Sequence, residues 1–465
     1  MPGAGLETGE SREDRGSIPP PSVHQSIRST DRFQVQRFAS ALSAPLPLLR
    51  GKEPVGPSMT QSPPVNIGSF EGPAGAVARY YPELLQGANA CLAVFGAMAL
   101  SGRTKPLSLI FEAASGFGKT AIVQMAFPLA GSALDQYAYR SDKFTPKAFV
   151  THAANIKKDE LAQIDLLPKL NGKVLLTKEL APLFRGREED LKDNFSILIS
   201  VLDGKGFTSD SGTHGRRGYS EPVLFNWIGA TTPLPPSTHR LMSQLGTRLL
   251  FYELPAIAPT EEQLLAYAKR DEADAAENEC QRATNEFLVE FFSTLNVGSI
   301  PPETITFSEQ QSLELVRWAR LLVAGRAEVH FEKTGTNWEP VAAMPAEGPW
   351  KVVQYFKDLA RGHAVVHYRA DIDDSDLALV AEVALSSIPG NIRPIVRRLR
   401  ETGTLDTPMV EKLCRVTSPT ARNYIRQLGL LGIADLRKGK PDAAMLAPKH
   451  QWLNQANSKS IHRII

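Results

Sequence analysis

A glycine-rich segment carries the clearest chemical pattern in the chain. Residues 113–120 read Ala-Ala-Ser-Gly-Phe-Gly-Lys-Thr, which fits the spacing G-x-x-x-x-G-K-[ST] except that alanine replaces the first glycine. Glycines let the backbone wrap closely around phosphate oxygens. Lys119 would reach the β- and γ-phosphates of a nucleotide, and the Thr120 hydroxyl would ligate Mg²⁺. The pattern predicts a nucleotide site formed by Ser115, Gly116, Phe117, Gly118, Lys119 and Thr120.

The same letters could also form an ordinary glycine-rich turn between a strand and a helix. An apolar run at 107–111 precedes the glycines, and the segment TAIVQMAF follows them. A buried strand before the loop and a helix after it are the context that a phosphate site requires. This context favours nucleotide binding over the ordinary turn.

A phosphate-binding loop needs an acidic partner on a neighbouring strand, and Glu179 is the candidate. Four mainly apolar residues, 174–177, lead to it, so it would stand at the carboxyl end of a strand. A carboxylate there can activate the attacking water or help to hold the metal. Lys178 stands where a second carboxylate is expected, so the pattern supports binding more strongly than hydrolysis. The alternative is a surface Lys-Glu pair at a strand end.

Strands and helices must alternate for these side chains to meet. Apolar runs at 107–111, 174–176, 223–230 and 249–252 are separated by helical segments, which predicts a largely parallel α/β sheet. Helical patterns then follow, interrupted at 326–349 by a loop or hairpin. The first residues are rich in Ser, Pro, Gly and Arg, which is typical of disorder. We expect a disordered leader at 1–68, an α/β core at 69–258, a helical lid with an insertion at 259–390, and a C-terminal unit at 391–465.

Composition excludes several classes of protein. Cys91, Cys280 and Cys414 stand alone, without paired spacing, which excludes a disulfide scaffold and a Cys-rich metal site and makes a reducing cytoplasm the expected location. The longest apolar run, 88–100, is shorter than the roughly 20 residues that cross a bilayer. The acidic N-terminal residues lack the apolar stretch of a signal peptide. We therefore expect no contact with a membrane.

Charge is distributed unevenly along the chain. The formal net charge is +2, but residues 391–465 hold 14 of the 52 basic and 5 of the 50 acidic residues, a local balance of +9 against −7 for the rest. Such asymmetry often marks an end that faces nucleic acid. A basic tail without a partner is the alternative.

This basic end has the pattern of a winged helix-turn-helix. A first helix is expected from Pro408 to Cys414, and a second is capped by Thr417 or Ser418 with Pro419 as its first residue. The segment DLRKGKP would supply a basic wing. We expect a core of Leu413, Ile425 and Leu428, with Gly429 and Gly432 ending the second helix.

The outward face of the second helix is the candidate DNA contact. Thr420, Arg422, Asn423 and Arg426 would face outward. In a DNA-binding module this helix enters the major groove while the wing touches phosphate. Winged helices also dock proteins, but the local charge of +9 favours DNA.

The order of these elements resembles the AAA+ ATPases, and among them the minichromosome maintenance (MCM) helicases and related bacterial and phage ATP-binding proteins. The resemblance covers residues 107–388. It implies a P-loop AAA+ three-layer α/β sandwich with a helical lid, which the winged helix follows here. In that family the two nucleotide motifs precede a helix, a basic hairpin, a sensor strand and an arginine finger.

The resemblance assigns a hairpin to the segment that follows the helix expected at 189–202. Lys205, His214, Arg216 and Arg217 would there face DNA phosphates inside a ring. A solvated loop is the alternative. If the hairpin forms, it gives the α/β core a DNA contact separate from the winged helix.

Three further residues receive roles from the resemblance. Thr232, at the end of the segment LFNWIGATT, aligns with the sensor that orients the attacking water. Arg248 would be the arginine finger that reaches the γ-phosphate on a neighbouring subunit, although a strand-end charge is the plain alternative. Lys351 stands where the sensor-2 arginine would contact nucleotide, and it keeps the charge without the bidentate fork.

The resemblance thus predicts an ATPase that uses ATP and Mg²⁺ and yields ADP and phosphate, acting as a DNA helicase or a DNA-remodelling motor. An arginine finger implies self-association into a ring, for which we expect a hexamer. A second hypothesis is a nucleotide-gated DNA- or protein-binding ATPase with little hydrolysis. A third is a winged-helix regulator with an ATPase sensor.

Overall fold

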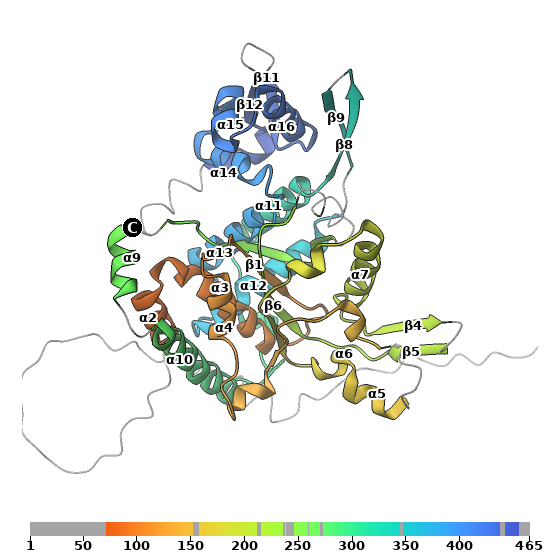
Figure 1. The fold of residues 1–465 in the computed structure, drawn as a ribbon, viewed down its shortest axis with the longest axis vertical. Coiled ribbons are helices and arrows are strands. Elements are labelled where there is room, and N and C mark those ends of the chain that lie inside the picture. The colour runs from red at the N-terminus through yellow and green to blue at the C-terminus, as the bar shows by residue number, and fades with distance from the viewer. Residues whose placement is uncertain are drawn as a thin grey trace, which may run out of the picture.

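The elements of the protein are arranged as Figure 1 shows. The computed structural model describes residues 71–151, 158–211, 215–235, 238, 246–258, 260–269, 273–335, 337–344, 347–437 and 442–454. The leader expected at 1–68 and the side chain of His214 lie outside these residues.

A parallel five-stranded sheet forms the centre of the molecule. Its order is β2-β3-β6-β1-β7, and β1 pairs in parallel with both β6 and β7. The expected α/β sheet is confirmed. The strands are β1 (Ser108–Glu112), β2 (Ala138–Arg140), β3 (Val174–Thr177), β6 (Asn226–Thr231) and β7 (Leu250–Glu253). The three-residue β2 at the sheet edge was not foreseen, because so short and half-exposed a strand has no apolar run.

Alternate residues of the central strands enter two hydrophobic clusters on opposite faces of the sheet. Leu109 and Phe111 of β1 join one cluster, whereas Ile110 joins the other. Helices cover both faces, as period-two burial requires. One face packs against α3 (Leu85–Gly96), α4 (Lys119–Met125), α10 (Ala273–Thr294), α12 (Trp350–Val366) and α13 (Asp374–Ser386); the other packs against α6 (Leu166–Lys169) and α7 (Glu188–Val201).

Helices α3 and α12 approach each other unusually closely. A Cβ on Gly96 would lie 2.2 Å from the Gly362 carbonyl oxygen, and a Cβ on Gly362 would lie 2.2 Å from the Ala93 carbonyl oxygen. Two glycines therefore set this contact. Because the helices after β7 share one hydrophobic cluster with the sheet, the expected helical lid is packed on the core along α12 and α13.

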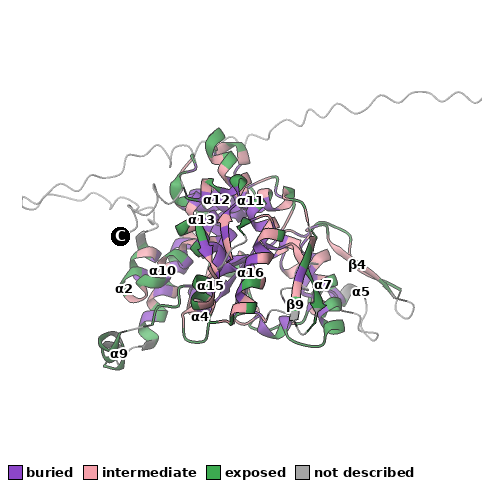
Figure 2. Ribbon diagram, turned by 90° about the horizontal axis from the view of Figure 1, so that it is seen from above, coloured by how far each residue is buried: buried purple, intermediate pink, exposed green. Residues whose placement is uncertain are grey.

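The remaining helices and the two hairpins lie nearer the surface. Figure 2 shows exposed residues on α9 and toward the tip of the β4–β5 hairpin. Both hairpins expected from the sequence are present: β4 pairs with β5, and β8 pairs with β9. These elements are α2 (Glu71–Tyr80), α5 (Lys158–Ile164), β4 (Phe207–Ser211), β5 (Gly215–Tyr219), α9 (Glu261–Ala268), α11 (Glu309–Gly325), β8 (Glu328–Thr334) and β9 (Asn337–Met344).

The C-terminal unit combines three helices with an antiparallel sheet of order β10-β12-β11. Helices α15 and α16 match the two expected helices. Two details were wrong: the Leu413 side chain is 39% exposed instead of being in the core, and Gly429 lies inside α16, so only Gly432, at φ 65°, follows the helix. The elements are α14 (Arg393–Thr402), β10 (Thr404–Asp406), α15 (Thr407–Cys414), α16 (Ser418–Leu430), β11 (Ala434–Arg437) and β12 (Ala443–Leu446).

In the part of the chain that the structure describes, no helix has the length and apolar character needed to span a bilayer.

Candidate functional site

The predicted phosphate-binding loop connects β1 to α4. Gly116 and Gly118 have φ angles of 88° and 74°, in the left-handed region that glycine enters without steric strain. Ser115 and Phe117 complete the turn, and Lys119 is the first residue of α4. The two glycines thus supply the backbone conformation that lets consecutive N–H groups converge on an anion.

The outer side of this loop is supported by the segment before α3. A Cβ on Gly118 would lie 2.4 Å from the Leu84 side chain, whereas a Cβ on Gly116 would meet nothing within 4 Å. Leu84 is itself buried. Position 118 therefore excludes a side chain both by its backbone angle and by its packing, while the loop at Gly116 stays open.

Lys119 and Glu179, predicted from separate motifs, meet at the carboxyl edge of the sheet. Lys119 Nζ lies 3.8 Å from Glu179 Oε2, with side-chain exposures of 9% and 39%. Glu179 Oε1 also accepts a hydrogen bond from the Ala181 N–H at 2.9 Å, which orients the carboxylate. Thr120 follows Lys119 in the first turn of α4 and is half-buried.

Lys178 and Glu179 follow the last residue of β3 and contact different groups. The Lys178 ammonium lies 5.3 Å from the centre of the Phe127 ring, beyond the far end of α4. Lys178 therefore contributes no ligand in place of the missing carboxylate, and Glu179 is the acidic side chain that this strand end supplies.

Thr232 follows β6 at the same edge of the sheet. Its hydroxyl accepts a hydrogen bond from Arg185 Nη2 at 3.1 Å. The segment before Arg185 is fixed to β6, because the Leu180 N–H donates to the Ala230 carbonyl at 2.7 Å and Phe184 is fully buried. The sequence motifs did not indicate that Arg185 lies at the site. The short apolar turn between Glu179 and Arg185 was a local signal that the two residues lie near each other.

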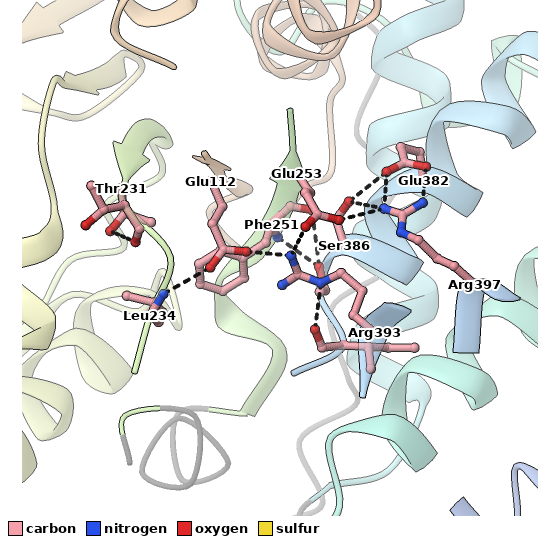
Figure 3. Close-up of polar contacts among 12 residues, drawn as sticks. Glu112, Thr231, Leu234, Phe251, Glu253, Glu382, Ser386, Arg393 and Arg397 are labelled. Atoms are coloured by element: carbon pink, nitrogen blue, oxygen red, sulfur yellow. Dashed lines mark hydrogen bonds and ion pairs between the residues drawn. The ribbon is translucent and has the colours of Figure 1, made fainter. Parts of the chain in front are cut away.

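A buried ion-pair network joins the loop-bearing strand to α14 (Figure 3). Glu112, the last residue of β1, pairs with Arg393 Nη1 at 2.6 Å and accepts a hydrogen bond from the Leu234 N–H at 3.2 Å. Arg393 also lies 3.1 Å from Glu253. Both members of the pair are about 4% exposed, so each charge depends on the other. No local pattern indicates this contact, because the two residues are 281 positions apart.

Arg248 lies at the opposite, amino edge of the sheet, just before β7. Its guanidinium donates to both carboxylate oxygens of Asp203, at 3.0 and 3.1 Å. Lys351 and Lys105 lie 3.6 and 3.7 Å from the same carboxylate. Partial burial raises the pKa of Asp203, but the hydrogen bond and charge of Arg248 outweigh it, so this pKa lies below its ordinary value.

The structure does not bring Lys351 to the glycine-rich loop of its own chain. Asp203, which it contacts, also binds Lys105, and Lys105 lies before β1, whereas the phosphate-binding loop follows β1. The full length of the strand therefore separates Lys351 from Lys119. The family resemblance placed Lys351 on a helix but could not show which edge of the sheet that helix end would reach.

The predicted DNA-contacting residues fall on two separate elements. Lys205 precedes β4, and Arg216 and Arg217 lie on β5; Lys205 and Arg216 are exposed, and Arg217 is half-buried. On α16, Arg422 is exposed.

The other two predicted residues of α16 contact the chain itself. Asn423 Nδ2 donates to the Trp338 carbonyl at 2.6 Å, and Arg426 Nη1 lies 3.0 Å from Glu339 Oε2. Both partners belong to β9, so the hairpin lies against this face of α16.

The residues at the loop fit a nucleotide with Mg²⁺. Among the described residues no cluster of three or more His, Cys, Asp and Glu side chains could hold a metal ion by itself. Mg²⁺ in phosphate sites keeps several waters and takes only one or two protein oxygens. The Thr120 hydroxyl and the Glu179 carboxylate meet that smaller requirement. No protein-family model matches the chain, and no curated protein matches it.

Proposed function

We propose that the protein is an ATPase of the AAA+ type, similar to the MCM module, which binds ATP with Mg²⁺ and hydrolyses it to ADP and phosphate. The observation that carries the proposal is the meeting of Lys119 and Glu179 at 3.8 Å beside a loop with two left-handed glycines. The strand order supports it, because β6, which leads to Thr232, lies between β1 and β3. The carboxyl ends of parallel strands share one edge, so the three motifs meet there.

Binding would begin at the loop. The backbone N–H groups from Ser115 to Lys119 would cradle the phosphates, and the Lys119 ammonium would turn from Glu179 toward the negative oxygens. Thr120 would hold Mg²⁺, and Glu179 would either help to hold it or act as the general base; the ion would supply positive charge against the phosphate oxygens. Leu84 leaves no room for a side chain at Gly118.

Hydrolysis would use the polar groups beside the loop. Glu179 would accept the proton of the attacking water, which its oriented carboxylate allows. Thr232 would orient that water through its hydroxyl. Arg185 donates to the same hydroxyl at 3.1 Å, and its guanidinium would neutralise charge on the γ-phosphate.

Arg248 would complete the site of a neighbouring subunit. It lies at the amino edge, away from the loop of its own chain, as an arginine that acts between subunits must. Its present partner is Asp203, which a neighbour's phosphate would replace as the anion. A closed ring, for which a hexamer is our proposal, gives every site such an arginine.

DNA is the proposed partner. The C-terminal unit has the helices, three-stranded sheet and basic charge of a winged helix, with α16 as the helix that would enter the major groove. Arg216 and Arg217 on β5 would add phosphate contacts inside the ring. ATP turnover would then drive a DNA helicase or a remodelling motor.

One observation favours a second function, a nucleotide-gated binding protein with little hydrolysis. Lys178 contacts the Phe127 ring and leaves Glu179 as the acidic side chain of the strand end. A metal with fewer protein ligands can still support tight ATP binding while turnover is slow.

ATP binding and turnover by the full chain, with and without single-stranded DNA, separate these functions. We expect Glu179→Gln to keep ATP binding and to lower turnover by about 100-fold, the usual size of a general-base effect. Glu189→Gln, the same change at an exposed position of α7, is the control. ATP binding without turnover by the unchanged protein would favour the second function, and a chain that binds no ATP would refute both.

Strand separation is measured independently with a forked duplex, alongside the oligomeric state of the chain with ATP. A ring that hydrolyses ATP but never unwinds the fork would refute the helicase and leave the ATPase.

A further inference from the structure

The β8–β9 hairpin covers the face of α16 that carries predicted DNA contacts. In Figure 1 the hairpin rises beside the C-terminal unit, and its contact with α16 runs along β9. Asn423 donates to the Trp338 carbonyl at 2.6 Å, and Arg426 pairs with Glu339 at 3.0 Å. Arg422, on the same helix, is exposed. Two of the three predicted side chains are thus occupied by a segment of the same chain.

The hairpin offers these side chains the kind of partner that duplex DNA would offer. The Asn423 amide receives a carbonyl acceptor, as it would from a base edge, and the Arg426 guanidinium receives an anion, as it would from phosphate. A helix in the major groove also needs this face open along its length. Hairpin and duplex therefore compete for the same donors and the same surface.

The contact between hairpin and α16 is weak enough to be displaced. Arg426 and Glu339 are 42% and 37% exposed, and exposed ion pairs contribute little to stability. Trp338 is 60% exposed, so its ring is not inserted between the two elements. Two grooves lie beside this contact; their described lining includes Pro340, Ala343, Leu430, Leu431 and Leu436.

The chain just beyond the base of the hairpin is hydrogen-bonded to the segment that carries Arg248. Glu347, three residues beyond β9, accepts a hydrogen bond from the Thr247 N–H at 3.0 Å. Lys351 lies 3.6 Å from Asp203, which is also the partner of Arg248. A shift of Arg248 toward another subunit's phosphate would therefore pull on the base of the hairpin.

We propose that the β8–β9 hairpin is an autoinhibitory gate on α16, which duplex DNA must displace, and that engagement of Arg248 with a neighbouring nucleotide favours its opening. This inference rests on the proposed DNA contact of α16 and specifies how that contact is regulated. Charge complementarity identifies duplex DNA as the competitor: the surface under the gate carries Arg426, beside the exposed Arg422, in the segment whose balance is +9.

Duplex binding by the full chain and by a hairpin-shortened variant tests the gate. Glu328 and Met344 are paired across the base of the hairpin, so a short Gly-Ser turn can replace residues 329–343. We expect the variant to bind a fluorescein-labelled, mixed-sequence duplex about tenfold more tightly, which equals about 1.4 kcal/mol. Unchanged circular dichroism and ATP-analogue affinity verify its fold.

Single substitutions test the ion pair without removing the hairpin. Glu339→Gln should tighten duplex binding by about threefold, because it removes the anion that competes for Arg426. Glu332 stands opposite Glu339 on β8 and is exposed, so Glu332→Gln makes the same change in charge and should have a smaller effect. Equal effects of the two substitutions would mean that the loss of one negative charge, and not the loss of the Arg426–Glu339 pair, changes duplex binding. This result would overturn the role of the pair in the gate.

The outcomes separate the gate from the DNA contact. Equal duplex affinity of the full chain and the shortened variant overturns the gate and leaves DNA binding intact. A lack of duplex binding by both overturns the gate together with the proposed DNA contact. A non-hydrolysable ATP analogue should tighten duplex binding by the full chain only; the same gain in the shortened variant overturns the coupling to Arg248.

Discussion

The predicted residues of the glycine-rich loop and those of the α16 face have different partners in the folded chain. At the loop, Lys119 at the start of α4 and Glu179 just after β3 lie 3.8 Å apart, as their proposed chemistry needs. On α16, Asn423 and Arg426 contact a hairpin some 85 residues earlier in the chain. A motif therefore indicates which chemistry a surface could perform, whereas distant segments decide whether that surface is free.

Replacement of Lys119 is expected to have the largest effect, because it tests whether the loop is an assembled site at all. Lys119→Ala should weaken ATP binding by about 100-fold, since hydrogen bonds to charged groups contribute about 1.5–3 kcal/mol. Titration with a fluorescent ATP analogue measures it. Lys178→Ala removes an equal charge that lies on the Phe127 ring and should change the affinity by no more than about twofold. Equal losses in both variants would contradict the site.

Gly118→Ala tests whether the loop requires a left-handed residue without a side chain at this position. It should destabilise the protein by about 2 kcal/mol, because alanine is strained at φ 74° and its Cβ would contact Leu84. Gly131 has φ 75° and open space around it, so Gly131→Ala should cost about 1 kcal/mol from the backbone angle alone. Chemical denaturation measures both. Equal costs would show that the Leu84 contact contributes nothing.

Arg185→Ala tests a residue beside the loop that the sequence motifs did not indicate. We expect about a tenfold lower kcat, because the guanidinium near the transferred phosphate is lost. Affinity for ADP should not change, since the γ-phosphate is absent from ADP. Arg187→Ala, two residues further along the same segment, is the control. A loss of ADP affinity in Arg185→Ala would instead indicate a structural role.

Arg422 and Arg426 allow an exposed and an occupied arginine to be compared on α16 itself. In the full chain, Arg422→Ala should weaken duplex binding by about fivefold and reduce the salt dependence by about one ion, as for a phosphate contact. Arg426→Ala should change binding less, because Glu339 already occupies that side chain. Removal of the hairpin should make the two effects similar. A larger effect of Arg426→Ala in the full chain would mean that α16 is open.

Acid should lower the stability of the protein through His367, and this effect should be the smallest of the series. Burial, with the nearby charges of His363 and Arg369, lowers the pKa of His367, the residue that follows α12, from 6.5 to about 4. The unfolded chain therefore binds the proton first, and this contribution to stability is complete above about pH 6.5 and lost toward pH 4. His367→Gln should remove roughly 2 °C of the fall in Tm over that range. The exposed His330→Gln serves as the control, and an unchanged profile would contradict the assignment.

Short-range patterns predicted the elements, and they failed where a side chain depends on a distant partner. The buried strands and both C-terminal helices follow from apolar spacing and helix signals. Leu413 was assigned to the core from helical spacing, yet it is 39% exposed, while Val410 is the apolar residue of α15 that is buried. Lys351 was placed by the family resemblance, and only its contact with Asp203 showed which edge of the sheet it reaches. Arg393 had no local signal, because its partner Glu112 lies 281 residues away.

Neighbouring residues are enough to specify the conformation of the glycine-rich loop, since glycine at 116 and 118 and lysine at 119 act through local backbone angles and a fixed position at the start of a helix. Which charges meet depends on how distant segments pack. Glu179 reaches Lys119 because parallel strands end at one edge, and Glu339 reaches Arg426 because an inserted hairpin lies against α16. The physical reason is range: backbone conformation is set by a few neighbouring residues, whereas an ion pair requires two segments to be positioned by the packing of the whole core.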